Sequence, residues 1–212
     1  MTADDLIAYW SQMKIGTVHP DDNRYISAEK FATRLCPIPW AGPLKDAKVY
    51  LLFLNPGLSP EDFAYESANT DFSAVLRANI SEGSQPYFYL LDRFSDHPGH
   101  RWARTTFGSD IQEGQAKHLC IVQLVPYHSE DGACARSIAS GLPSSTAARQ
   151  FVRDTLVPQA RAGQIGLVVA RSSKLWQIEG EDDCLVIYRG AECRRAFQTV
   201  GTRGGQLLRK MI

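Results

Sequence analysis

The chain has 212 residues, of which 44% are hydrophobic and 22% are charged, which is the composition of a medium-sized globular protein with a real core. Its 23 basic and 23 acidic side chains cancel, so no overall field draws the molecule to nucleic acid or to a membrane. Charge is still unevenly placed: residues 189–212 carry six basic side chains and one acidic one. They form either a basic C-terminal face or an ordinary solvated surface.

The five cysteines are scattered singly, and no two of them form a Cys-x-x-Cys pair. Their odd number and the lack of a signal peptide predict a reducing, cytoplasmic location. No apolar run approaches the roughly 20 residues of a membrane span, so no membrane partner is expected. The cysteines are Cys36, Cys120, Cys134, Cys184 and Cys193.

The first 44 residues read as an N-terminal helical extension packed on the core. Residues 3–14 place Leu6, Ile7, Trp10 and Met13 on one face of a predicted helix. Residues 27–35 are a second predicted helix. The Pro- and Gly-rich segment CPIPWAGP, residues 36–43, is expected to be neither helix nor strand. Residues 45–212 then form the predicted α/β domain.

Four short apolar runs in this domain predict strands. They are continuous rather than alternating, as in strands that are covered on both faces, and plausible helices lie between them. The clearest helix spans 144–163, with Ser144 or Ser145 as its cap, a kink at Pro158 and an end at Gly163. The alternation predicts a three-layer α/β/α sandwich around a four-stranded, mainly parallel sheet. The runs are Val49–Leu54, Leu119–Val125, Ile165–Ala170 and Cys184–Tyr188.

Ligands of such sheets bind beyond the carboxyl ends of the strands, so the residues after each run are candidates for the site. No dinucleotide, Walker or nucleophile-elbow motif is present, which disfavours an unrelated Rossmann-like or flavodoxin-like hydrolase. Three histidines, His97, His100 and His128, match no ligand spacing, so neither a metal nor another cofactor is expected. The segments after the runs are 55–57 (NPG), 126–129 (PYHS), 171–173 (RSS) and 189–190 (RG).

The segment LNPGLS, residues 54–59, resembles the first active-site motif of the uracil-DNA glycosylase superfamily. It is most similar to the mismatch-specific (thymine/uracil) and single-strand-selective branches. IVQLVPYHS at 121–129 is similar to the second core strand of that superfamily, and LVVARSSKLW at 167–176 to the third strand and the next helix. DHPGHRW at 96–102 resembles a segment that follows the first motif in the mismatch branch. The resemblance implies hydrolysis of the bond between sugar and base, for uracil or a damaged or mismatched base in DNA.

That chemistry needs a positioned water, donors for the departing base and an aromatic face. Asn55 suits the first role, although a plain Asn-Pro-Gly turn is the alternative. Pro56 and Gly57 let the backbone approach a ligand closely, and the amides of Gly57 and Leu58 are expected to face it. His128 is a candidate donor to the base or contact to a phosphate; otherwise it is an ordinary loop histidine.

Three further features complete the predicted substrate site. An aromatic wall is expected from Phe63, Tyr65 or Phe72, with core packing as the alternative. The Gln123 amide can pair with the edge of a pyrimidine or make a structural hydrogen bond. Ser172 is expected either to contact the substrate or only to cap a helix.

The superfamily's second active-site motif, His-Pro-Ser or Asn-Pro-Ser, is not recognisable after the fourth run, where the chain reads YRGAECRRAFQTVGTRGGQLL. Arg203, Gly204 and Gly205 could instead form a helix start whose free amides hold a nucleic-acid phosphate. The missing motif favours an alternative function, a catalytically weak or inactive module of the same fold that binds a nucleobase, a nucleotide or nucleic acid.

Overall fold

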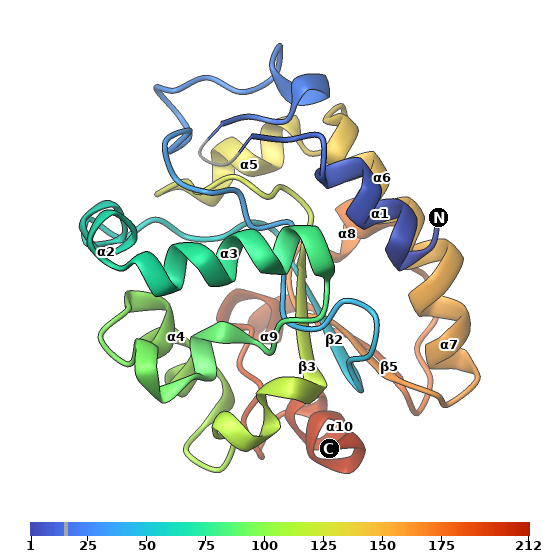
Figure 1. The fold of residues 1–212 in the computed structure, drawn as a ribbon. Coiled ribbons are helices and arrows are strands. Elements are labelled where there is room, and N and C mark those ends of the chain that lie inside the picture. Colours follow the sequence, from blue (N-terminus) through green and yellow to red (C-terminus); the bar gives the residue numbers. More distant parts are fainter. Residues whose placement is uncertain (15–16) are drawn as a thin grey trace.

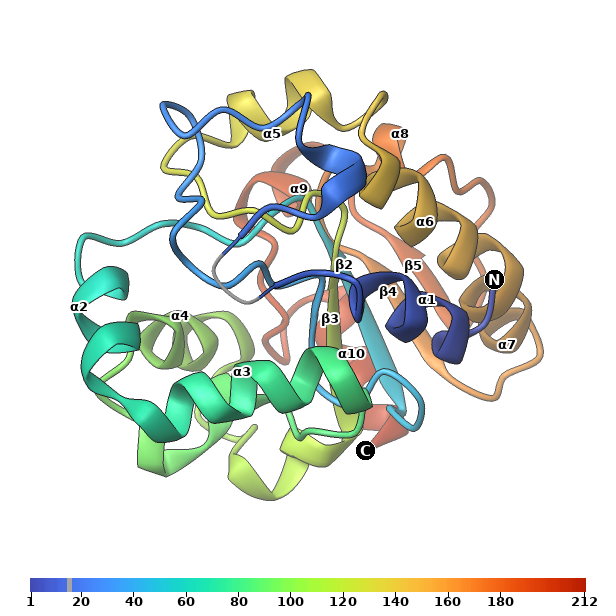
Figure 2. The same ribbon diagram turned by 45° about the horizontal axis from the view of Figure 1, so that its top comes forward.

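The computed structural model describes residues 1–14 and 17–212. It has an α/β architecture in which helices lie on both sides of one sheet (Figures 1 and 2). The strand order is β1-β3-β2-β4-β5. The strands are β1 (Trp40–Ala41), β2 (Val49–Phe53), β3 (Leu119–Gln123), β4 (Gly166–Val169) and β5 (Leu185–Ile187).

Each of the four predicted apolar runs contains one strand, and neighbouring strands among these four pair in parallel. The central strand β2 pairs with β3 on one edge and β4 on the other, so that Val49 lies opposite both Leu119 and Gly166. All five β2 residues are buried. This burial explains the continuous apolar run, because both faces of the strand are covered. The predicted α/β class is confirmed.

Over the described residues the sheet has five strands rather than the predicted four, and it is mixed. The additional strand, β1, pairs antiparallel with β3 and places Trp40 opposite Val122. The Trp40 indole donates to the Asn79 carbonyl at 3.1 Å, and the Asn79 amide donates to the Trp40 carbonyl at 2.7 Å. This reciprocal pair fixes a strand of only two residues, too short to have a recognisable pattern. The predicted domain boundary at residue 44 therefore falls between two strands of one sheet.

The first helix, α1 (Ala3–Trp10), is shorter than the predicted 3–14. Thr2 and Asp5 form a reciprocal cap at its start, and Leu6, Ile7 and Trp10 are buried in the core. The helix predicted over 27–35 is wrong, since this segment forms turns. The Ala32 amide donates to the carbonyl of His128 at 2.9 Å, which removes it from any helical ladder and ties the segment to a loop far along the chain.

The helix predicted over 144–163 is divided into two helices by a wider π-helical turn, Val152–Leu156, which ends just before Pro158. The predicted serine cap is wrong. Pro143 occupies the first helical position after Leu142, and the Ser145 hydroxyl donates to the Leu124 carbonyl at 2.7 Å instead. Gly163 ends the second helix with a φ of 70°, as predicted.

The helices that flank the strands differ in length and position. α1, α6 and α7 lie on one side of the sheet, and α10 packs against β4 on the other (Figures 1 and 2). The helices after α1 are α2 (Asp62–Ala68), α3 (Thr70–Glu82), α4 (Pro98–Phe107), α5 (Gly132–Ile138), α6 (Pro143–Phe151), α7 (Val157–Arg161), α8 (Ser173–Trp176), α9 (Gly190–Arg195) and α10 (Arg203–Met211), with short 3₁₀ turns at Pro20–Asp22, Phe88–Leu90, Asp92–Phe94 and Glu113–His118.

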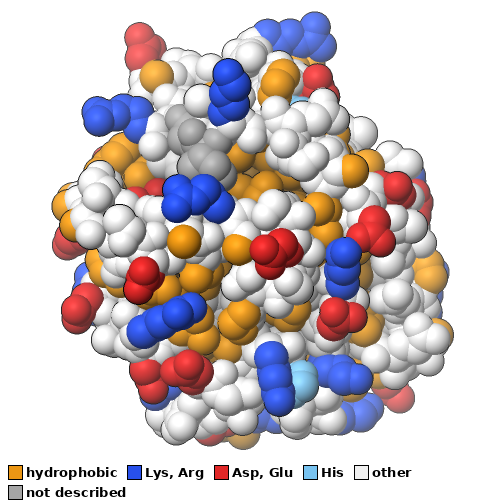
Figure 3. Space-filling view, in the orientation of Figure 1, with side chains coloured by type: hydrophobic (Ala, Val, Ile, Leu, Met, Phe, Trp, Pro, Cys, Tyr) orange, Lys and Arg blue, Asp and Glu red, His pale blue; other side chains and the backbone are white. Residues whose placement is uncertain are grey.

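Basic and acidic side chains are interspersed on the face seen in Figure 3. Among the described residues, no helix combines the length and apolar character needed to cross a bilayer. All five cysteines are unpaired.

Candidate functional site

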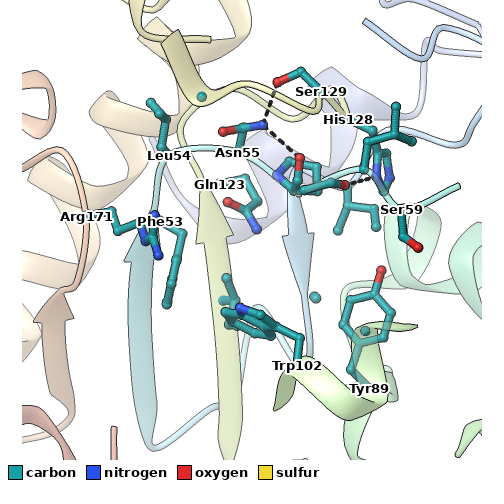
Figure 4. Close-up of a pocket in the computed structure, with 18 of the residues that line it drawn as sticks. Phe53, Leu54, Asn55, Ser59, Tyr89, Trp102, Gln123, His128, Ser129 and Arg171 are labelled. Atoms are coloured by element: carbon teal, nitrogen blue, oxygen red, sulfur yellow. Dashed lines mark hydrogen bonds between the residues drawn. The ribbon is translucent and has the colours of Figure 1, made fainter. Parts of the chain in front are cut away.

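A cavity of about 790 Å³ opens at the carboxyl ends of the parallel strands. Its wall includes residues that follow or end four different strands, such as Asn55, Gln123, Arg171 and Gly190. Figure 4 shows several of them converging on one space. The cavity thus lies where the strand pattern predicted a ligand site.

The side-chain amide of Asn55 is fixed by two acceptors. Its Nδ2 donates to the Pro56 carbonyl at 2.7 Å and to the Ser129 hydroxyl at 3.0 Å. Ser129 uses its own hydrogen on the Asp131 carbonyl at 3.1 Å, so toward Asn55 it can only accept. The nitrogen must therefore face Ser129, and the free oxygen Oδ1 points away from it (Figure 4). The result is a fixed acceptor in the wall of the cavity.

The Asn-Pro-Gly turn is held from behind by the loop after β3. The Ser129 amide donates to the Pro56 carbonyl, and His128 Nδ1 donates to the Gly57 carbonyl at 2.8 Å. The amides of Gly57 and Leu58 have no acceptor among the described residues. A Cβ added to Gly57 would meet no atom within 4 Å. Pro56, Gly57 and Leu58 all line the cavity, with open space in front of Gly57.

The Gln123 side chain ends β3 and lines the cavity. Its Oε1 is buried and has no hydrogen-bond partner. The structural hydrogen bond considered as an alternative for this side chain is therefore absent among the described residues. Figure 4 shows Gln123 between Asn55 and Trp102. Because a buried amide oxygen without a partner carries a free-energy cost of about 1–3 kcal/mol, a ligand donor would stabilise this site.

The aromatic wall consists of residues other than the predicted ones. Phe53, Tyr87, Tyr89 and Trp102 line the cavity. Trp102 is 39% exposed, and its ring stands edge-on to that of Phe53, with 5.4 Å between ring centroids. It is the most exposed of the four aromatic residues in this wall. Trp102 lies inside the DHPGHRW segment, so the resemblance of that segment was the signal that could have identified it.

The three predicted aromatic residues do not line this cavity. Phe63 is exposed on α2 and faces a smaller hollow beside Glu66. Phe72 is fully buried in the core. Tyr65 packs edge-on against Phe72 and accepts a hydrogen bond from Asn69. Their positions on the exposed and inward faces of α2 and α3, rather than their distance along the chain from Asn55, decide this outcome.

His128 is buried, and burial lowers its pKa. A neutral ring with its hydrogen on Nδ1 carries a lone pair on Nε2, so it cannot donate to a departing base. The predicted donor role does not fit this geometry. His128 instead orients the Gly57 carbonyl and with it the Asn-Pro-Gly turn.

A second buried histidine, His97, lies near His128 in the same wall. Its Nδ1 accepts from the Gly99 amide at 2.8 Å, so Nε2 carries the hydrogen and has no hydrogen-bond partner. That nitrogen is 3.9 Å from a carboxylate oxygen of Asp62, too far for a hydrogen bond. Burial lowers the pKa of His97 to about 4 and raises the pKa of Asp62. The inner wall therefore holds a neutral imidazole donor without an acceptor.

Ser172 lines the cavity and adopts a left-handed backbone with a φ of 55°. It precedes α8, but its side chain makes no capping hydrogen bond. The helix-cap alternative is therefore not what the structure has. A non-glycine residue in this conformation carries backbone strain.

Arg203, Gly204 and Gly205 do not form the predicted phosphate cradle. Arg203 pairs with Glu181 and Glu192. The Gly204 amide donates to the Tyr188 hydroxyl, and the Gly205 amide donates to the Thr202 hydroxyl. A Cβ at Gly204 would lie 2.6 Å from the Tyr188 oxygen. These glycines allow α10 to pack closely on the sheet, so their amides are not free for a ligand.

Among the described residues, no group of three or more metal-ligating side chains could hold an ion. Comparison with models of known families, with curated proteins and with solved structures gives no match. Function must therefore be inferred from the geometry of the cavity and from the resemblance of the motifs.

Proposed function

We propose that the protein hydrolyses the bond between sugar and base for uracil, or for a damaged or mismatched base, in DNA, as a uracil-DNA glycosylase-like protein. One observation carries this proposal. The Asn55 amide is locked with its oxygen free, in a cavity whose wall also presents the unpaired Gln123 amide and the exposed face of Trp102. Hydrolysis of a glycosidic bond needs a positioned water. Binding of the planar base needs polar groups of the protein at its edge and an aromatic side chain against its face.

The cavity offers a group for each step. The Gln123 amide can pair with the donor–acceptor edge of a pyrimidine, while Trp102 holds the flat ring. Asn55 Oδ1 accepts from a water and orients it toward the sugar carbon as the base leaves. An amide is too weak a base to remove the proton early, so the reaction depends on the leaving base. The free amides of Gly57 and Leu58 can stabilise the negative charge that develops on the base.

The DHPGHRW segment supports the same proposal. His97 precedes α4 and Trp102 lies within it, so this segment lines the cavity beside the Asn-Pro-Gly turn although it is about 40 residues farther along the chain. A segment that resembles a neighbour of the motif in the mismatch branch is thus also a neighbour of the motif in space.

A binding module of the same fold is the second candidate. It is favoured by the C-terminal segment, in which the amides of Gly204 and Gly205 are used inside the protein. Without a second motif to engage a strand, the cavity would hold a nucleobase-containing ligand without turnover.

Release of base from labelled oligonucleotides distinguishes the two candidates. The substrates are single-stranded uracil, G·U, G·T and hypoxanthine, with alkali to cleave the resulting abasic sites. We expect cleavage that falls by about 10²–10³-fold in Asn55→Ala, the usual scale for loss of a positioning or transition-state group. Asn23→Ala, an exposed amide outside the cavity, is the matched control. Absence of cleavage by the folded protein on every substrate would favour the binding module.

A further inference from the structure

Three arginine side chains surround the mouth of the cavity: Arg136 on α5, Arg171 after β4 and Arg194 on α9. All three are exposed. Among the described residues, none of them donates a hydrogen bond from its guanidinium or forms an ion pair, whereas Arg203 and Arg209 are both bound to carboxylates. Of the two carboxylates among the described lining residues, Glu130 is exposed and Asp62 is buried. The mouth is therefore positively charged in a protein with no net charge.

One of these arginines lies close to the locked amide. A Cβ added to Gly132, the first residue of α5, would be 3.5 Å from Arg136 Nη1 and 3.8 Å from Asn55 Oδ1. The guanidinium and the amide oxygen therefore flank the same small volume, which is empty because residue 132 has no side chain. Arg136 therefore lies beside the amide that the proposed function places at the glycosidic bond.

We propose that this mouth binds a phosphate carried by the sugar of the ligand, so that the ligand is a nucleoside 5′-phosphate. The inference rests on the proposed function, because that function places the base at Gln123 and the glycosidic bond at Asn55. The phosphate of the same nucleoside then lies among the arginines. Guanidinium groups bind phosphate oxygens in a two-pronged geometry, whereas a neutral base or nucleoside carries no negative charge to pair with three unpaired guanidiniums.

Calorimetric titration of the full chain tests the proposal with deoxyuridine and its 5′-monophosphate. We expect the monophosphate to bind about tenfold more tightly or better at low salt, from one or more charge-assisted hydrogen bonds. Raised salt should weaken its binding while leaving deoxyuridine unchanged. In Arg136→Gln/Arg171→Gln the advantage of the phosphate should disappear. Arg153→Gln, at an exposed arginine outside the cavity, should keep it. Equal affinity for the two ligands, or an unchanged advantage in the double variant, would overturn the proposal.

The same phosphate could belong to a free nucleotide or to the end of a strand. A single-stranded oligonucleotide with a 5′-phosphorylated terminal deoxyuridine is therefore titrated beside the free monophosphate. Tighter binding of the oligonucleotide assigns the site to a strand end, and tighter binding of the free compound assigns it to a nucleotide. Either result must depend on the two arginines.

Inorganic phosphate separates this inference from the proposed function. It should raise the melting temperature of the native protein, at matched ionic strength, and have no such effect on the double variant. That result together with no base release would leave the phosphate site standing and the hydrolytic function refuted. Base release, together with phosphate binding that the arginine changes do not affect, would support the hydrolytic function and refute the phosphate site.

Discussion

The side-chain amide of Asn55 cannot flip by 180°, because both groups that face its nitrogen are hydrogen-bond acceptors in this loop. The sequence indicated only that an amide follows the first buried strand. The distant Ser129, from the loop after β3, decides which of its two polar atoms reaches the ligand. The same contacts determine what an aspartate in this place would do.

Asn55→Asp should be destabilising at neutral pH rather than activating. A carboxylate oxygen in place of Nδ2 would face the Pro56 carbonyl and the Ser129 oxygen, which raises the pKa of the new carboxyl in the folded protein. The protonated form is then the one that fits, so the unfolding free energy falls as the pH rises from the ordinary aspartate value of about 4 to the raised value of the folded protein.

Denaturant unfolding at about pH 4 and about pH 7 measures this effect. We expect a loss of about 1–3 kcal/mol relative to native protein at the higher pH and a smaller loss at the lower pH. Asn23→Asp, at an exposed site without a side-chain hydrogen bond, should lose no stability at either pH. An equal loss at both values would refute this reading of the amide.

His97 makes stability depend on pH in the opposite sense. Its ordinary pKa is 6.5, and burial lowers the value in the folded protein to about 4. Between these limits the unfolded chain binds more protons than the folded one, so stability is lost as the pH falls. The slope approaches about 1.4 kcal/mol per pH unit.

The His97→Asn variant isolates this contribution. An asparagine oxygen can still accept from the Gly99 amide at the start of α4 but does not titrate. Asp62, His128 and Arg101 are retained in the variant, so the difference between the two unfolding free energies reports on His97 and on its coupling to these groups. We expect native protein to lose about 1.5 kcal/mol relative to the variant between pH 6.5 and 5. Parallel pH profiles would contradict the predicted protonation.

At the scale of elements, α4 is a wall of the cavity whose start is fitted tightly to an aromatic ring. A Cβ added to Gly99, in the first turn of α4, would lie 2.5 Å from Cδ1 and 2.8 Å from Cζ of Tyr89. Tyr89 lines the cavity, so any residue larger than glycine must push its ring or tilt the helix.

Gly99→Ala should therefore lower stability by about 1–3 kcal/mol, the usual cost of overpacking. It should also weaken ligand binding through the displaced ring. Thermal unfolding and the deoxyuridine titration measure the two effects. Gly114→Ala is the control, since a Cβ there meets nothing within 4 Å. If Gly99→Ala is as stable as that control, the Tyr89 ring moves aside without cost and the prediction is wrong.

The strands and the centre of the site could be predicted from the sequence because their signals are local. Continuous apolar runs revealed β2 to β5. Asn55 and Ser172 were found from the ends of those runs, and Gln123 from the resemblance of the second run to a core strand of the superfamily. The aromatic wall could not be found in this way. Trp102 reaches the cavity only because α4 folds back beside the Asn-Pro-Gly turn, and Phe72 points into the core because of the direction in which α3 packs. The failed helix at 27–35 has the same origin, since a carbonyl about 100 residues away takes the Ala32 amide.

At the scale of the whole molecule, residues 1–14 and 17–44 contribute to the core that supports the site. Leu6, Ile7 and Trp10 are buried, and β1 completes one edge of the sheet. The buried Asp22 carboxylate accepts from the Tyr127 hydroxyl at 2.7 Å and from the Ser144 amide at 3.0 Å. It thereby anchors the loop that carries His128 and Ser129. The N-terminal segment thus anchors the loop after β3, and this loop in turn fixes Asn55.

A chain that begins at residue 45 should consequently fail to fold cooperatively. The truncation exposes the apolar surface that α1 covers, leaves the edge of β3 unpaired and removes the carboxylate that anchors Tyr127. Near-ultraviolet circular dichroism and thermal unfolding measure the outcome, and we expect a weak aromatic signal without a sharp transition. Tyr127→Phe in the full chain is a second, less disruptive test of the same contact. It removes the hydroxyl from Asp22 without removing apolar surface, and we expect a loss of about 1–3 kcal/mol with cooperativity retained. A truncated chain with native-like spectra and a sharp transition would show that residues 45–212 are an independent domain.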